Sequence, residues 1–349
     1  MSKETNRVET IKEIKNQLLN SARPIFLFDD DPDGLASFLI LYKLVRAGKG
    51  ITIRGSTLTN DFVEKVNEYS PDLIIILDKP KVEQEFIDKV RAKCIWIDHH
   101  DLQKPKGIIY FNPRKWEPEK NIPTSQLCYE ITEENEWLAT VGIVADWCIP
   151  PQELINKTRE KYGDIIPEKI ANAPDALYNS KIGKLARVFS FNLKGRTKDV
   201  YNNMKILSRI KNPQELLEKK HSQAKIIMKQ YEQHQKEYEK VMKQIEIDEK
   251  DNILLFKYND NANSYTIDLS NELLYNHPDK YIIIARHHNE SYKCSLRSKK
   301  YPVEPILQEV LKTINGTGGG HLHACGAIIP EEEFDEFIKL IREATKKDF

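Results

Sequence analysis

Apolar and polar positions along the first 150 or so residues follow a pattern typical of strands that alternate with helices. Amphipathic segments such as Leu35–Ala47 and Glu83–Lys93 separate short apolar runs. The runs are Ile25–Phe28, Ile51–Arg54, Leu73–Leu77, Cys94–Ile97 and Ile108–Phe111. The alternation predicts a parallel α/β sheet wrapped by helices. Continuous apolar runs such as LIIIL favour strands that are buried on both faces.

The remainder of the chain predicts a helical region, a connector and a second, smaller α/β domain. Residues 151–212 are mainly helical in pattern, and residues 214–247 contain neither Gly nor Pro, which predicts one long connecting helix. Strands are then expected at Ile253–Phe256, Tyr281–Arg286, Lys293–Arg297 and Ala324–Ile329, and helices at about Val303–Ile314 and Glu331–Ile341. The predicted boundaries are 1–212 for the first domain, 213–250 for the connecting helix and 251–349 for the second domain.

The charge balance argues against a protein-wide attraction to polyanions. The 349 residues contain 53 Lys and Arg against 53 Asp and Glu, so the net charge is zero. Any polyanion site must therefore be a local patch. Residues 181–198 are rich in cations, and we interpret them either as a solvated helix face or as a phosphate-binding patch: Lys181, Lys184, Arg187, Lys194, Arg196 and Lys198.

The cysteines and the hydropathy predict a cytoplasmic protein. The five cysteines are scattered and form no C-x-x-C pair, which favours reduced, mostly buried thiols over disulfides or a zinc site. The chain contains no apolar run of about 18 residues, the length that a membrane-spanning helix needs.

The stretch FLFDDDPDGLASF concentrates carboxylates where a predicted strand ends and a predicted helix begins. Four acidic residues lie within Asp29–Asp33, and they repel one another unless a cation neutralises them. The spacing Asp29-x-Asp31-x-Asp33-Gly34 matches half of an EF-hand loop. However, loop position 12, which must be a bidentate Glu, is Ile40, and a strand precedes the motif instead of a helix. The stretch therefore predicts a metal site of another kind.

Further ligands for this metal are expected at the ends of neighbouring strands, because crevices in open α/β sheets form there. Asp78 follows Leu73–Leu77, and Asp98-His99-His100 follows Cys94–Ile97. Asp146 ends the apolar segment ATVGIVAD. A single Asp after a strand is usually a helix cap. Several such clusters on one rim instead predict a metal centre.

The ordered motifs DDDPDG, Asp78, Asp98-His99-His100 and Asp146, followed by GGGH at Gly318–His321, resemble the DHH/DHHA1 phosphoesterase superfamily. The resemblance covers both predicted domains. It implies a parallel-sheet DHH domain that is joined by the long helix to a smaller α/β DHHA1 domain. It also implies a hydrolytic site that holds two Mn²⁺ ions, for which Mg²⁺ could substitute, since oxygen-rich shells with an imidazole suit these ions.

The resemblance assigns a role to each residue of the first domain. Asp31 would bind the first ion, Asp33 the second, and Asp78 would bridge both. His99 and Asp146 would complete the coordination shell of the second ion. Asp98 would orient its neighbours, and His100 would face the phosphate.

One position separates the branches of the superfamily. Members that cleave dinucleotides usually carry a metal-binding His at the position occupied here by Leu27. Asp29 instead matches the leading Asp of the D-x-D-x-D-G motif in RecJ-like exonucleases, and it is expected to bind metal directly or through water. The chain is therefore most similar to the RecJ-like branch.

In the second domain, the sequence GTGGGHLHACG predicts a substrate-binding segment. Gly318, Gly319 and Gly320 would let the backbone approach a phosphate or sugar closely, and His321 and His323 would add donors. Arg297, at a strand end, has a planar fork suited to phosphate. The alternative is a glycine-rich turn with incidental histidines. The resemblance implies that this domain binds nucleic acid.

The function expected from the resemblance is a manganese-dependent exonuclease that degrades single-stranded DNA or RNA to mononucleotides. One alternative is a nanoRNase-like phosphodiesterase of short oligonucleotides or nucleotides. Another is a replisome scaffold related to RecJ. The expected partners are single-stranded nucleic acid and replication or repair proteins, with no membrane association.

Overall fold

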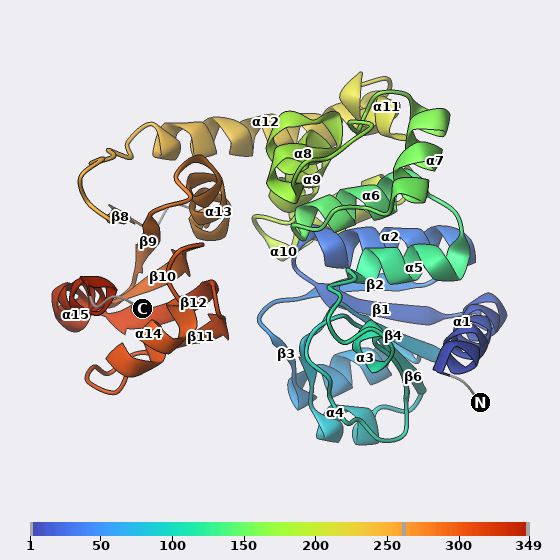
Figure 1. The fold of residues 1–349 in the computed structure, drawn as a ribbon. Coiled ribbons are helices and arrows are strands. Elements are labelled where there is room, and N and C mark those ends of the chain that lie inside the picture. Colours follow the sequence, from blue (N-terminus) through green and yellow to red (C-terminus); the bar gives the residue numbers. More distant parts are fainter. Residues whose placement is uncertain (1–2, 260–262, 347–349) are drawn as a thin grey trace. The chain divides into compact units, whose positions relative to one another are not determined.

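The computed structural model describes residues 3–259 and 263–346 and divides the chain into two compact units, 1–232 and 233–349 (Figure 1). No helix in these described ranges is both long enough and apolar enough to cross a membrane. All five cysteines are unpaired, and four of them are buried.

The first unit is built on a five-stranded parallel sheet with the strand order β2-β1-β4-β6-β7. The strands are β1 (Pro24–Asp29), β2 (Lys49–Ile53), β4 (Leu73–Leu77), β6 (Lys93–Ile97) and β7 (Ile109–Phe111). The predicted parallel α/β sheet is thus confirmed. The register pairs Phe28 with Leu77 and Leu77 with Ile97, so β1, β4 and β6 run to the same edge of the sheet.

Helices cover both faces of this sheet (Figure 1). On one face, Phe38 of α2 stacks on Phe28 of β1, with ring centroids 4.8 Å apart. On the other, an apolar core joins Leu27 and Trp96 to α3 and α4. The elements before residue 116 are α1 (Lys3–Asn20), α2 (Pro32–Val45), β3 (Thr57–Leu58), η1 (Asn60–Phe62), α3 (Val63–Tyr69), β5 (Lys81–Val82), α4 (Gln84–Lys89) and η2 (Pro113–Lys115).

The rest of the unit is helical, as predicted for residues 151–212. The helices are α5 (Thr124–Thr132), α6 (Glu136–Ala145), α7 (Gln152–Tyr162), α8 (Ala173–Asn179), α9 (Lys181–Asn192), α10 (Thr197–Leu207), α11 (Pro213–Leu217) and α12 (Ser222–Met242), of which α12 continues past residue 232 into the second unit. ATVGIVAD does not end a strand, because it forms most of α6. That helix is apolar and buried around nearly its whole circumference, so its hydrophobic pattern cannot be told from that of a buried strand.

Several predicted helices have different limits in the structure; the one expected at about Val303–Ile314, for example, ends at Val310. The single helix expected from residue 213 is wrong, because α11 ends at Leu217 and α12 starts at Ser222. Lys219 adopts a left-handed φ of 53°, and the Lys220 N–H bonds to the Glu215 carbonyl, which closes α11. The helix expected to continue to Lys93 ends at Lys89, because Lys93 begins β6.

The second unit contains a five-stranded mixed sheet with the order β11-β12-β10-β9-β8. Only β8 and β9 are parallel. Its elements are β8 (Ile253–Tyr258), α13 (Thr266–Asn276), β9 (Tyr281–His288), β10 (Ser291–Arg297), α14 (Val303–Val310), β11 (Thr317–His321), β12 (Ala324–Pro330), η3 (Glu331–Glu333) and α15 (Phe334–Lys346). The core lies between the sheet and helices α14 and α15. The glycine run lies in a strand, β11, and not in the glycine-rich turn that was the alternative interpretation.

Candidate active site

The carboxyl ends of β1, β4 and β6 bring acidic residues from distant parts of the sequence to one edge of the sheet. Asp29 is the last residue of β1, and Asp78 and Asp98 directly follow β4 and β6. Because these strands end in register, the three carboxylates start from neighbouring positions. Asp78 and Asp98 are buried.

The start of α2 adds two more carboxylates. Asp31 is the N-cap of this helix, and its Oδ1 accepts a hydrogen bond from the Gly34 N–H at 2.8 Å. Pro32 follows at the first helical position, where its missing N–H costs nothing. Asp33 lies in the first turn and is buried. The Asp-Pro-Asp-Gly sequence thus forms a helix cap and presents acidic oxygens beside the strand ends.

Asp33 is held by the start of a second helix, α5. Its Oδ2 accepts from the Thr124 N–H at 2.8 Å, and its Oδ1 accepts from the Ser125 N–H at 3.1 Å. The Thr124 hydroxyl donates to Asp78 Oδ1 at 3.0 Å. Gly142 of α6 is required for this packing, because a Cβ there would lie 2.7 Å from Asp33 Oδ1. Thr124 and Ser125 were not predicted, and the Pro-Thr-Ser helix start was their only sequence signal.

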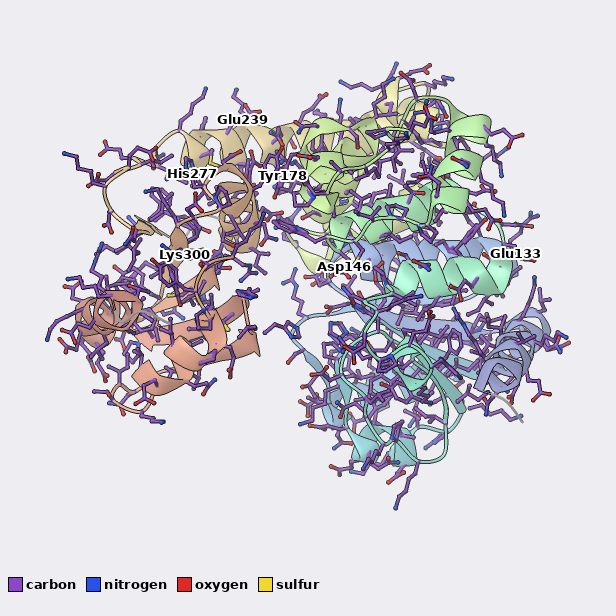
Figure 2. All side chains as sticks on the ribbon, in the orientation of Figure 1. Glu133, Asp146, Tyr178, Glu239, His277 and Lys300 are labelled. Atoms are coloured by element: carbon purple, nitrogen blue, oxygen red, sulfur yellow. The ribbon has the colours of Figure 1, made fainter. Side chains whose placement is uncertain are left out.

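The imidazole ring of His99 lies between the carboxylates of Asp78 and Asp146. Its Nε2 lies 3.3 Å from Asp78 Oδ1, and its Nδ1 lies 3.8 Å from Asp146 Oδ2. Asp146 is the C-cap of α6 and is labelled in Figure 2. The structure therefore brings Asp146 close to His99, from the end of a helix and not from the end of a strand.

His100 and Asp98 form a hydrogen-bonded pair. His100 Nδ1 lies 2.8 Å from Asp98 Oδ1, and the His100 backbone N–H donates to Asp98 Oδ2 at 3.1 Å. The Asn112 side chain, which is fully buried, donates to Asp98 Oδ2 at 3.1 Å and to the His100 carbonyl at 2.9 Å. Asn112 was not predicted, and a lone Asn after a short strand gives no specific signal. The predicted orienting role of Asp98 has a geometric basis in these contacts.

Lys79 is a second residue that the motifs did not indicate. Its side chain is fully buried, and its ammonium group lies 2.6 Å from Asp29 Oδ1. The same group donates to the Ile53 carbonyl at 3.2 Å and to the Gly55 carbonyl. One oxygen of Asp29 is therefore neutralised by the protein itself.

Asp31, Asp78 and Asp146 are crowded together, and among the described residues none of them pairs with a lysine or arginine as Asp29 does. Burial, followed by repulsion from neighbouring carboxylates, raises the pKa of Asp31 well above its usual range. Burial raises the pKa of Asp78 to about 7, with Asp33 adding to the effect, and raises the pKa of Asp146 to about 7. Hydrogen bonding to Asp78, with attraction to Asp146 and Asp33, holds the pKa of His99 well above 6.5 against the opposing effect of burial. Such a site favours a bound cation.

Two sets of side chains in the described residues have donor atoms close enough to hold a metal ion. One is Asp29, Asp31 and Asp78, and the other is Asp78, His99 and His100, with the donor atoms of each set within 4.8 Å of one another. Asp78 belongs to both sets, as expected of a bridging ligand. Asp146 Oδ2 is buried and has no hydrogen-bond partner among the described residues. Carboxylates with imidazole suit Mn²⁺ or Mg²⁺, so these residues fit the implied ions.

In the second unit, the sheet register separates the predicted substrate-binding residues into two faces. Arg297 pairs with Ala324, which pairs with His321, so these residues share one face with Gly319. Gly318 and Gly320 pair with the core residues Ala327 and Cys325 and therefore lie on the opposite face. His323 lies between β11 and β12, with its Nδ1 3.3 Å from the Tyr301 carbonyl oxygen.

Arg297 uses several of its donors within the unit. Its Nε donates to Asn271 Oδ1 at 2.9 Å, and its Nη1 donates to the carbonyls of Leu296 and Cys325 at 2.9 and 3.0 Å. These bonds fix the guanidinium at the end of β10. In the cationic segment 181–198, Lys181 pairs with Asp164 and Arg196 pairs with Asp199, as expected for a solvated surface.

Comparison with known protein families identifies both domains of the chain. A profile of the DHH family, N-terminal domain, matches residues 25–173, and a profile of the DHHA1 domain matches residues 251–347. An uncharacterized protein of Methanocaldococcus jannaschii is 29% identical over 201 residues, which are 50% of this chain and 46% of that protein. The chain thus spans about half the length of the curated relative that it matches.

Solved structures share the fold. RecJ in complex with Mn²⁺ from Thermus thermophilus has a TM-score of 0.69 at 15% identity, covering 98% of this chain and 55% of that one. The DHH domain of a member of the s1p family of ribosomal proteins has a TM-score of 0.70 at 14% identity, covering 99% and 93% of the two chains. With a matching DHH profile over the metal-ligand sets and a matching DHHA1 profile over the mixed sheet, the chain belongs to the DHH/DHHA1 superfamily, whose members are metal-dependent phosphoesterases.

Proposed function

We propose that this protein is a manganese-dependent phosphodiesterase that acts as an exonuclease on single-stranded DNA or RNA and releases mononucleotides. The observation that carries the proposal is the position of Asp78, which belongs to both candidate ligand sets. A shared carboxylate supports a pair of ions, which would supply an activated water and would stabilise the attacking and leaving oxygens of the phosphate. Asp29, Asp31, Asp33, Asp78, His99 and Asp146 would hold the two ions.

Asp33 contributes from a constrained position. Both of its oxygens accept backbone N–H bonds at the start of α5, so its carboxylate cannot rotate freely. Thr124 ties Asp78 to the same helix start. These contacts support a site whose ligands are held before the ions arrive, which reduces the free-energy cost of assembling it.

His100, the third member of the second candidate ligand set, would contact the phosphate that is cleaved and not an ion. Asp98 holds its Nδ1, and Asn112 holds both Asp98 and the backbone of His100. A ring whose Nδ1 is bonded in this way is fixed in orientation, so its Nε2 is the atom available to a substrate oxygen or leaving group.

The second unit would bind the strand through the sheet face that carries Gly319, His321 and Arg297. The absence of side chains at Gly319 and Gly326, which pair across β11 and β12, leaves backbone accessible on this face. His321 and Arg297 can supply donors in the same row. Phosphate and sugar contacts of this kind are independent of sequence, which suits a degradative enzyme.

Digestion of end-labelled single-stranded DNA and RNA, with dinucleotides in parallel, tests the proposal. We expect Mn²⁺-dependent release of mononucleotides from the long strands. If only the dinucleotides were cleaved, the exonuclease proposal would be refuted and a phosphodiesterase of short oligonucleotides would be favoured. If a folded protein that binds Mn²⁺ cleaved neither substrate, a scaffold role would be favoured instead.

A further inference from the structure

Asn121 lies in the loop before α5, outside the family motifs, and its side chain contacts the metal site. Its Oδ1 lies 2.8 Å from His99 Nδ1. Its amide nitrogen donates to Cys148 Sγ at 3.2 Å, close to the end of α6. Because the nitrogen of the amide is directed to the sulfur, the oxygen is directed to the imidazole.

This contact decides which nitrogen of His99 carries a hydrogen. An amide oxygen can only accept, so Nδ1 is the nitrogen that keeps its hydrogen when the ring is neutral. The other nitrogen, Nε2, then faces Asp78 Oδ1 at 3.3 Å. In a neutral ring with Nδ1 protonated, Nε2 has only a lone pair, so two acceptors face each other. A cation between them removes that repulsion.

Asp146 is the other group near Nδ1, and it does not compete with Asn121. Its Oδ2 lies 3.8 Å from Nδ1, which is beyond hydrogen-bond length. Arg114, which contacts the same residue, donates to the backbone carbonyl of His99 and not to the ring. Of the side chains in the described part of the structure, Asn121 is therefore the one within hydrogen-bond distance of Nδ1.

We propose that Asn121 is a positioning residue that fixes His99 with a hydrogen on Nδ1, so that Nε2 is directed at Asp78 and is the metal-binding atom. The inference rests on the metal site of the proposed function and adds the residue that orients it. Metal-binding histidines commonly donate their second N–H to a fixed acceptor, and losing that acceptor weakens metal binding about 10–100-fold.

Three variants test the inference. Asn121→Leu removes the acceptor at similar size, and Asn121→Asp keeps an acceptor at the same position. Glu119→Leu makes a matched change at an exposed position of the same loop. Each is measured by Mn²⁺ calorimetry, thermal melting, and nitrogen NMR of the histidine rings with Mg²⁺ and, without metal, at alkaline pH. His99→Gln assigns the His99 signals.

We expect Asn121→Leu to lose about 10–100-fold in Mn²⁺ affinity and to show mixed tautomers at His99. Asn121→Asp and Glu119→Leu should keep the Nδ1–H form and an affinity no weaker than that of the wild type. An Asn121→Leu protein with unchanged tautomer and affinity, even with a lower melting temperature, would overturn the inference. If Asn121→Leu does not fold, loss of the Nδ1–H form in Asn121→Asp would overturn it equally. Failure of the wild type to bind Mn²⁺ would refute the proposed function instead, and the metal-free spectra would still decide the tautomer.

Discussion

Lys79 and Asp29 form a buried ion pair at the edge of the metal site, with the ammonium nitrogen 2.6 Å from Asp29 Oδ1. The carbonyls of Ile53 and Gly55 accept the other two ammonium hydrogens, so the group is fully satisfied. Asp29 therefore differs from Asp31, whose charge has no such partner and whose pKa is raised by burial and by neighbouring carboxylates. The protein itself neutralises the charge of Asp29, whereas the charge of Asp31 is left for a metal ion to neutralise.

We expect Asp29→Asn and Asp31→Asn to change the stability of the metal-free protein in opposite directions. Asp29→Asn leaves the buried charge of Lys79 without its counter-ion and should lower the free energy of unfolding by about 2–3 kcal/mol, since the two carbonyl acceptors remain. Asp31→Asn removes the repulsion from neighbouring carboxylates, and the Asn side chain can still cap α2. This variant should therefore raise the free energy of unfolding. Denaturant unfolding in the presence of a chelator measures both changes. Equal effects of the two variants would contradict the distinction.

Asp78→Ala should abolish hydrolysis and reduce Mn²⁺ binding at both positions, because Asp78 is shared by the two ligand sets. Calorimetry on the wild type should give two Mn²⁺ per chain. Asp30→Ala is the matched control, since Asp30 pairs with Arg54 at 3.1 Å and belongs to neither ligand set within the described residues. Full double occupancy in Asp78→Ala would refute the bridging assignment.

The two adjacent histidines should respond differently to substitution. His99→Ala should weaken Mn²⁺ binding. His100→Ala and Asp98→Asn should retain metal and lose about 10²–10⁴-fold in turnover, the usual size of general acid–base effects. Asp98 is buried and bonded to Asn112, so its substitution can also destabilise the fold. Thermal melts distinguish a loss of turnover from unfolding. If His100→Ala lost metal to the same extent as His99→Ala, the ring would be a ligand and not a phosphate contact.

The stability of the metal-free protein should fall as the pH rises from about 5 to 7. Asp78 and Asp146 have pKa values raised to about 7, so in this window the folded state holds protons that the unfolded state has released. The raised pKa of His99 acts in the same direction, because the stability it contributes is lost as the pH rises through its folded-state pKa. Melting curves with a chelator measure the slope, and saturating Mn²⁺ should reverse it. A flat or rising profile without metal would show that the pKa values of Asp78 and Asp146 are not raised in the folded state.

Arg297→Ala should weaken binding of nucleic acid without affecting metal. We expect a higher KM and a salt dependence flattened by about one unit of slope for a lost phosphate contact. Because Arg297 also bonds to the carbonyls of Leu296 and Cys325, a melting curve must accompany the kinetics. His321→Ala, at an exposed position in the same row, is the comparison that leaves these bonds intact. Unchanged KM in both folded variants would exclude this face as the binding surface.

The amino-acid sequence by itself determined the strands that build the metal site and most of the residues that line it. Leu73–Leu77 and Cys94–Ile97 were predictable because a buried parallel strand is a continuous apolar run, and the polar residues that follow such runs must gather at one edge of the sheet. Asp29, Asp31, Asp78, Asp98, His99 and His100 could be placed in this way.

Only the tertiary structure decided the remaining contacts. It placed Asp146 at the end of a helix, ended α11 before a left-handed Lys219, and brought Lys79, Asn112, Asn121 and Thr124 to the site. Lys79, Asn112, Asn121 and Thr124 act through a few hydrogen bonds or ion pairs each, chiefly with partners from other segments of the chain. Such contacts leave no periodic pattern of apolar and polar positions, because they depend on where two distant segments meet and not on the local preference of either one.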